Sequence, residues 1–232
     1  MLDNLKNSFD FFIREKTRFS RKNYVPNERE RMRDYLKNLW VLDVLDKYFP
    51  AFPVATILDI GSKNWAYASA EHAFFKTRTE NFTLTGVELD AHRLYSNFYS
   101  RAEVAKFHIK NLPEANYIAG DLLSITQKFD AIIWFLPFLN EHPHKKWGLP
   151  MKHFKPEALL KHAYSLLNPE GAMLIVNQGE DEYETQQKLL QKLNIAYTPI
   201  GEIKSVFSGH KLKRFATLAG GQSANQSPNF LI

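Results

Sequence analysis

The sequence of 232 residues contains no cysteine. This absence excludes disulfide bonds and thiol nucleophiles, and it fits the cytoplasmic location that we expect. No apolar run approaches the length of a membrane-spanning helix, and the N-terminal stretch MLDNLKNSFDFFIREK lacks the order of charged and apolar segments found in a signal peptide. We therefore expect a soluble protein without membrane contacts.

The bulk composition is that of a globular protein, with 44% hydrophobic and 24% charged residues. The length suits one α/β domain better than two small ones. The net charge of +5 favours solubility and indicates an anionic partner only weakly. Much of that charge lies in residues 13–33, where eight Lys or Arg stand against three Glu and are interleaved with Phe19 and Tyr24. This segment could contact RNA, or it could be a solvated helix face followed by a flexible arm.

Hydrophobic periodicity divides the chain into three parts. Residues 1–50 read as a helical extension, with a capping-box pattern at Asn27 and Glu30 and a stop at the prolines of FPAFP. Residues 51–220 alternate short apolar strands with amphipathic helices, which predicts a mostly parallel sheet covered by helices on both faces. Residues 221–232 are small and polar and predict a flexible tail. The length of the connection 137–155 is unusual for a compact domain and favours a functional segment.

Acidic residues follow the first three predicted strands. Asp59 ends the first and precedes Gly61, a residue that lets the backbone turn tightly and approach a ligand. Glu88 ends the second, where a carboxylate can accept hydrogen bonds from both hydroxyls of a ribose. Asp121 follows the third, in position to accept from an adenine amino group. Because ligands of open α/β sheets bind beyond the carboxyl ends of the strands, these acids predict one shared nucleoside site.

The stretches ILDIG, GVELD, AGDLL, FDAIIWFLPF and LLNPEGAMLIVNQ resemble, in this order, the motifs of the class I S-adenosylmethionine-dependent methyltransferases. The resemblance covers residues 54–219. It implies a Rossmann-like sheet of seven strands with a final antiparallel pair, and S-adenosylmethionine as the cofactor across the strand ends. It also implies that the cofactor is bound by residues at the ends of the first four strands: Asp59, Gly61, Ser62, Trp65, Glu88, Leu89, Asp121, Leu122 and Phe135.

The first motif departs from the family pattern, because Lys63 and Trp65 stand where two glycines are usual. Trp65 could stack beside the sulfonium by cation–π attraction, or it could anchor the first helix in the core. Lys63 is expected to point to solvent or toward an acidic substrate, since a second cation near the sulfonium is unfavourable. The missing glycines put the affinity and the pose of the cofactor in question, not the fold.

The substrate side is expected beyond the fourth strand, in FLPFLNEHPHKKWGLPMKHF. Glu141, His142 and His144 are the candidate catalytic bases there. His142, His144 and His153 could also suggest a metal, but a solvated loop is the default interpretation, and we predict no metal site. The Asn/Asp-Pro-Pro-aromatic motif of amino-directed methylation is missing, which disfavours that chemistry.

The sequence therefore predicts a methyltransferase whose acceptor is a small molecule. An RNA acceptor is an alternative that rests on the basic segment 13–33. A methyltransferase-fold module that binds partners without catalysis is another, and the lost glycines are its best support. The sequence leaves the oligomeric state open.

Overall fold

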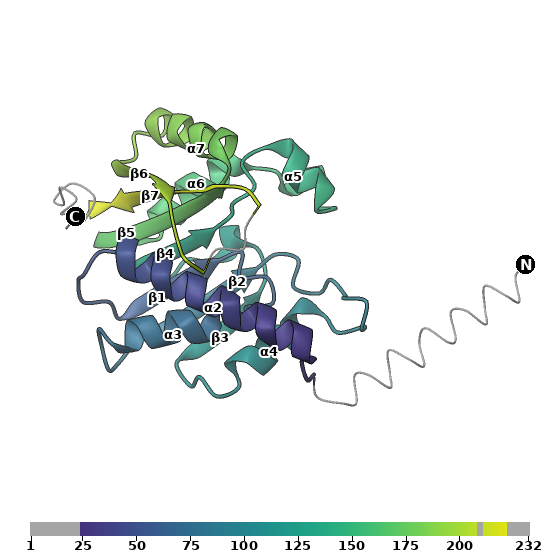
Figure 1. Cartoon of the computed structure of the whole chain (residues 1–232). Helices are drawn as coiled ribbons and strands as arrows, with labels where there is room; N and C mark the ends of the chain where they lie inside the picture. The colour runs from purple at the N-terminus through teal and green to yellow at the C-terminus, as the bar shows by residue number, and fades with distance from the viewer. Residues whose placement is uncertain (1–23, 208–210, 222–232) are drawn as a thin grey trace, which may run out of the picture.

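The computed structural model describes residues 24–207 and 211–221. Seven strands form one sheet in the order β3-β2-β1-β4-β5-β7-β6 (Figure 1). The strands are β1 (Thr56–Ile60), β2 (Thr83–Glu88), β3 (Ala115–Ala119), β4 (Phe129–Phe135), β5 (Leu167–Gln178), β6 (Tyr197–Ile203) and β7 (Arg214–Gly220). The first five pair in parallel, whereas β7 is antiparallel to both β5 and β6. The predicted α/β fold with seven strands and a final antiparallel pair is confirmed.

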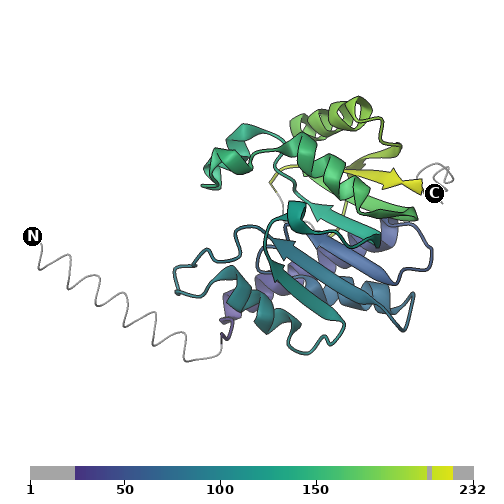
Figure 2. The same cartoon turned by 180° about the vertical axis from the view of Figure 1, so that it is seen from behind.

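Helices cover both faces of the sheet. One face carries α2 (Glu28–Tyr48), α3 (Ala68–Lys76) and α4 (Arg101–Ile109), and α2 crosses the front of Figure 1 beside α3. The other face carries α6 (Pro156–Ser165) and α7 (Glu180–Lys192), and α6 lies in front of the sheet in the reverse view of Figure 2. Short helical turns η1 (Leu122–Ser124), α5 (Glu141–Lys146) and η2 (Met151–His153) lie between these elements.

Alternation along the strands supplies a core on each face. Ile57 of β1 and Ile133 of β4 belong to the cluster under α2 and α3. Their neighbours Leu58 and Ile132 point the other way, into the cluster under α6 and α7. Side chains of a strand alternate between faces, so strands buried on both sides must be apolar throughout. This requirement explains the uninterrupted apolar runs in the sequence.

The N-terminal extension is part of this core over its described residues. Asn27 caps α2 in the predicted capping box, with its side chain bonded to the backbone of Glu30 and the Glu30 carboxylate bonded to the backbone of Asn27. Trp40 and Val44 of α2 pack into the cluster shared with α3. Residues 13–23 of the basic segment and residues 222–232 of the predicted tail lie outside the described residues.

Three local predictions differ from the structure. The stretch DAHRLYSNFYSRAEVAKFH, residues 90–108, predicts a single helix, but α4 begins only at Arg101, because Ser100 caps it and residues 90–99 form a loop. The fifth strand is predicted over AMLIVNQ, residues 172–178, but β5 starts at Leu167, and a register irregularity opposite β4 accommodates the Asn-Pro-Glu-Gly turn residues. The connection after β4 is partly helical, since it contains α5 and η2. None of the described helices is long and apolar enough to cross a membrane.

Candidate functional site

A cavity of about 610 Å³ opens at the carboxyl ends of the parallel strands. It lies where the strand order reverses between β1 and β4, which is the usual ligand position in such sheets. Helix α2 contributes one wall, and residues 136–155, which we name the roof segment, contribute another. The strand ends contribute Ile60, Gly61, Val87, Glu88, Gly120, Asp121, Trp134 and Phe135.

The turn after β1 has left-handed backbone at alternate residues. The φ angles are 72° at Gly61, 58° at Lys63 and 46° at Trp65. Only glycine adopts this conformation without steric cost, and each other residue there costs roughly 1–2 kcal/mol. The turn therefore keeps the backbone shape that three glycines would favour, although two of the three residues carry large side chains.

The Lys63 position offers a direct test of this strain. The free energy of unfolding of Lys63→Gly is expected to be about 1 kcal/mol higher than that of Lys63→Ala. Alanine keeps the steric cost of the left-handed backbone, and glycine does not. Both variants lose the same lysine side chain, so their difference isolates the backbone. The control is Lys110, where φ is −54° and alanine should be the more stable replacement. Urea denaturation measures the free energy of unfolding of the four variants. The same order of stability for glycine and alanine at both positions would contradict the left-handed backbone at Lys63.

Trp65 is buried in the core and does not line the cavity. Its indole Nε1–H donates to Glu71 Oε2 of α3 at 2.8 Å, and its ring centroid lies 6.2 Å from that of Tyr117. The indole fits because β2 has a glycine beneath it. A Cβ built on Gly86 would lie only 2.9 Å from Trp65 Cε3. Of the two roles considered for Trp65, the structure places the side chain in the position of a core anchor.

A buried polar network lies beneath the cavity on the α2 face. Tyr67 donates its hydroxyl hydrogen to Asp59 Oδ2 at 2.9 Å, and neither Asp59 nor Glu71 is exposed to solvent. Asp59 Oδ1 and Glu71 Oε1 have no hydrogen-bond partner among the described residues. Burial raises the pKa of both carboxyl groups well above the usual range. The charge of Glu88 also raises the pKa of Asp59, and the charge of Asp59 raises the pKa of Glu71. Burial therefore disfavours the charged form of both side chains.

Lys37 of α2 lies over this network. Its Nζ is 4.1 Å from the centroid of the Tyr67 ring, and the side chain lines the cavity. Burial, and after it the nearby ammonium of Lys63, lower the pKa of Lys37 to about 8, although Asp59 acts in the opposite direction. The residue thus holds its positive charge at neutral pH against a cost of desolvation.

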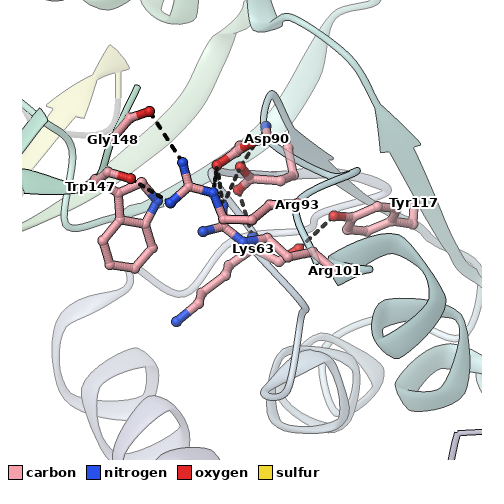
Figure 3. A network of polar contacts seen from close by, with 8 residues as sticks. Lys63, Asp90, Arg93, Arg101, Tyr117, Trp147 and Gly148 are labelled. Atoms are coloured by element: carbon pink, nitrogen blue, oxygen red, sulfur yellow. Dashed lines mark hydrogen bonds and ion pairs between the residues drawn. The ribbon is translucent and has the colours of Figure 1, made fainter. Parts of the chain in front are cut away.

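The Glu88 carboxylate already accepts several hydrogen bonds from the protein. Oε2 accepts from the Lys63 backbone N–H at 2.9 Å, and Oε1 accepts from the Asp90 N–H at 2.8 Å and from Arg101 Nη1 at 3.2 Å. Arg101 is almost fully buried and also pairs with Asp90 at 3.3 Å. Figure 3 shows Lys63, Asp90 and Arg101 of this network together with Tyr117, whose hydroxyl donates to the Lys63 carbonyl at 2.5 Å. The acid at the end of β2 is thus held rigidly beside the cavity.

The roof segment is attached to the same network. Arg93 donates to the carbonyls of Trp147 at 2.5 Å and Gly148 at 3.3 Å, and it pairs with Asp90 at 2.6 Å (Figure 3). The Trp147 ring lies 4.9 Å from Lys63 Nζ and 5.1 Å from the Arg101 guanidinium carbon. These cation–π contacts join the roof to the turn after β1 and to α4.

Some of the other predicted cofactor residues line the cavity, and the rest are buried behind its wall. Leu89, Asp121, Leu122 and Phe135 line the cavity together with Gly61 and Glu88. Asp121 Oδ1 accepts from the Leu123 N–H at 3.0 Å and so caps η1. Asp59, Ser62 and Trp65 are buried behind the cavity wall and do not line it. Contacts from these three residues to a ligand would have to come through the backbone or through a neighbour.

Of the three candidate bases, only His144 lies on the cavity wall. Glu141 and His142 are exposed on α5, and Glu141 pairs with Lys145 at 2.5 Å. The His144 ring contacts those of Phe138 and Phe154, with centroids 6.0 and 5.2 Å away. Its Nε2 lies 3.1 Å from the Pro150 carbonyl oxygen, which can only accept, so Nε2 carries the hydrogen and Nδ1 is left as an acceptor.

The charged residues of α2 and α4 were not among the predicted site residues. Lys37 and Trp40 lie one helical turn apart on α2, and both line the cavity. Arg101 of α4 and Trp147 of the roof segment line it as well. The sequence signal for Lys37 is a lysine on the buried stripe of a helix, and it is a weak one. Within the described chain, no group of three or more His, Asp or Glu side chains could hold a metal ion.

No family model and no curated protein matches the chain. A SAM-dependent methyltransferase from Aquifex aeolicus matches in structure with a TM-score of 0.58 at 13% identity, over 84% of this chain and 98% of that one. A ribosomal protein L11 methylase from Lactobacillus delbrueckii subsp. bulgaricus matches with a TM-score of 0.53 at 12% identity, over 79% of each chain.

A third match is the magnesium protoporphyrin IX methyltransferase from Synechocystis PCC 6803 with bound SAM. Its TM-score is 0.52 at 11% identity, over 88% of this chain and 90% of that one. At such identities the likeness concerns the backbone. The strand order, the reversed β7 and these matches together show that the chain has the Rossmann-like fold of the class I S-adenosylmethionine-dependent methyltransferases.

Proposed function

We propose that the chain is an S-adenosylmethionine-dependent methyltransferase that acts on a small molecule. The observation that carries this proposal is the convergence of Gly61, Glu88 and Asp121, from three successive strand ends, on one cavity at the switch point of the sheet. A fold alone does not define an activity, so the proposal rests on this site.

The side chains of the cavity fit the proposed cofactor. A carboxylate offers about four acceptor positions, and Glu88 uses three of them within the protein, which leaves one for a ribose hydroxyl. Asp121 keeps acceptor capacity beyond the bond to Leu123 and can receive an adenine amino group. Leu89 and Leu122 flank these acids and supply apolar surface for a flat base. Above Gly61 there is open space, because a Cβ built there meets no atom within 4 Å.

The cofactor would supply an electrophilic methyl group, which passes to a lone pair of the acceptor as the carbon–sulfur bond breaks and sulfur keeps the electron pair. The protein has then to position the acceptor and exclude water, and both tasks fit a cavity closed by the roof segment. An acceptor atom that carries a proton also needs a base. His144 Nδ1 is our candidate for that base, since the other two predicted bases are exposed.

The shape of the site favours a small molecule over RNA. The walls contain the aromatic side chains of Trp40, Phe135, Phe138 and Trp147, and a largely apolar cavity of this size suits a compact ligand better than a nucleotide chain. Most of the basic segment that suggested RNA lies outside the described residues, so the RNA alternative gains no support from the site.

Calorimetric titration with S-adenosylmethionine and S-adenosylhomocysteine tests the proposal. We expect binding of both, and an affinity at least roughly 10-fold lower for Asp121→Asn and for Glu88→Gln, because each loses a charged acceptor worth about 1.5–3 kcal/mol. Glu184→Gln is the control, since that carboxylate lies on α7 with a side chain that is 60% exposed. A chain that melts cooperatively yet binds neither ligand at millimolar concentration would be a binding module without this activity.

A further inference from the structure

Lys37 is a charged group of the cavity that the proposed cofactor contacts do not use. It lies on α2, whereas Glu88 and Asp121 line the cavity from the strand ends. Among the described residues, no carboxylate lies within the 4.0 Å ion-pair distance of its Nζ. Its contact is with the face of the Tyr67 ring, at 4.1 Å. A part-buried ammonium with a ring but no anion beside it is suited to an anionic ligand group.

An aromatic surface continues directly from Lys37. The Tyr67 and Phe135 rings meet edge to face with centroids 5.7 Å apart, and Phe135 meets Trp40 with centroids 5.4 Å apart. All three side chains line the cavity, and we name them the aromatic wall. Tyr67 is fixed by its hydrogen bond to Asp59, so this wall is rigid at the end nearest Lys37.

The charge of the cavity lining is positive. Its basic residues are Lys37, Lys63, Arg101, Lys146, Lys155 and Arg214, and its acidic residues are Glu88, Asp121 and Glu182. Two of those acids are engaged elsewhere: Glu88 holds Arg101, and Glu182 accepts from the Gln178 N–H at 3.2 Å. Among the described residues, neither Lys37 nor Lys63 forms a side-chain ion pair with an acid, and a bound anion would relieve the repulsion between the two ammonium groups.

We propose that the acceptor is a small anion with a flat apolar body, whose anionic group binds Lys37 while its body lies on the aromatic wall. This inference rests on the proposed function and narrows the class of its substrate. The aromatic wall supplies the contact area, and the ammonium supplies orientation, as in other sites with apolar walls and few polar groups. A negative acceptor also offsets the positive charge that a sulfonium would add beside Lys63.

Two fluorescent probes that differ in one charged group test the proposal without any methyl transfer. They are 8-anilinonaphthalene-1-sulfonate and N-phenyl-1-naphthylamine, which share the ring system, while only the first carries a sulfonate. Both are titrated into the full chain at pH 7, into Lys37→Met and Lys37→Arg, and into Lys188→Met as the control. Lys188 lies on α7 with a side chain that is 77% exposed. Thermal melts of each variant confirm that the fold is intact.

We expect Lys37→Met to weaken binding of the sulfonate probe roughly 10-fold or more, the loss of one charge-assisted contact. The neutral probe should be affected less than about 2-fold, Lys37→Arg should restore most of the sulfonate affinity, and Lys188→Met should change nothing. Equal losses for both probes, or no loss for either, would overturn the proposal, because Lys37 would then act only through packing.

The same titrations with saturating S-adenosylhomocysteine separate this inference from the proposed function. Sulfonate binding that persists beside S-adenosylhomocysteine supports a separate acceptor subsite at Lys37. Competitive displacement, together with an equal loss of S-adenosylhomocysteine affinity in Lys37→Met, would assign Lys37 to the cofactor carboxylate and overturn the inference. If S-adenosylhomocysteine does not bind at all but the two probes still differ, the proposed function fails and the anion site stands.

Discussion

Gly86→Ala is expected to lower the free energy of unfolding by about 1–3 kcal/mol in the otherwise unchanged chain, and by much less when residue 65 is already alanine. The added methyl group would lie 2.9 Å from Trp65 Cε3 and 3.0 Å from Ser62 Oγ, so the buried indole has to move. Trp65→Ala alone should cost about 3–5 kcal/mol, because a fully buried ring is removed. It also leaves Glu71 without the indole donor at 2.8 Å.

Urea denaturation of the single and double variants measures this coupling as a double-mutant cycle. The control is Gly120→Ala, whose Cβ would make only an ordinary contact with Ile118 at 3.6 Å and should be tolerated in both backgrounds. If Gly86→Ala costs the same with tryptophan or alanine at position 65, the strand glycine does not accommodate the ring.

Lys37→Met is expected to stabilise the protein at pH 7 by about 1–3 kcal/mol while it weakens the binding of anions. Burial lowers the pKa of Lys37 in the folded chain to about 8, whereas its usual value is 10.5. Between these two values the unfolded chain binds more protons than the folded one, so the cost of the buried ammonium decreases as the pH rises. Below pH 8 that cost is fully present, and above pH 10.5 it is absent. The groups that set this pKa are Lys63, which lowers it, and Asp59, Asp34 and Glu71, which raise it.

The difference in stability between Lys37→Met and the unchanged chain should therefore be largest near pH 7 and shrink as the pH approaches 10. Denaturation at both pH values measures it, with Lys188→Met as the exposed control. A gain that does not depend on pH would come from packing of the methionine, and a loss of stability at pH 7 would contradict the desolvation of Lys37. If Lys37→Met is more stable than the unchanged chain at pH 7 but not at pH 10, Lys37 is a residue that serves binding at the expense of stability.

Most of the fold could be predicted because it depends on periodicity, which a sequence displays directly. The apolar runs of β4 and β5 are buried on both faces and read as parallel strands. The helix expected from residue 90 begins only at Arg101, and the signal for this start is present in the sequence, because Ser100 and Glu103 have the spacing of a capping box. The start of β5 was also misplaced, because proline and glycine usually end a strand and here lie within an irregular part of it.

The candidate site could be predicted only where the strand ends define it. Glu88 and Asp121 lie at the cavity because the ends of neighbouring parallel strands meet at one edge of the sheet. The position of Lys37 depends on how α2 packs across that edge, and such long-range packing leaves little trace in local sequence. The same holds for Trp147, which comes from a segment far along the chain and reaches Arg101 only through the folding of the roof.

The left-handed backbone at residues 61, 63 and 65 bears on how such turns are recognised in other chains. A motif of three glycines is one way to allow positive φ angles at alternate residues of the turn. Here the turn adopts these angles with one glycine, and the space for the largest replacement is provided by Gly86 on a different strand. Two chains can thus share the geometry of this turn while they differ in nearly every residue of it. A search for the turn should accordingly score residues 61–65 together with the strand position that packs against them.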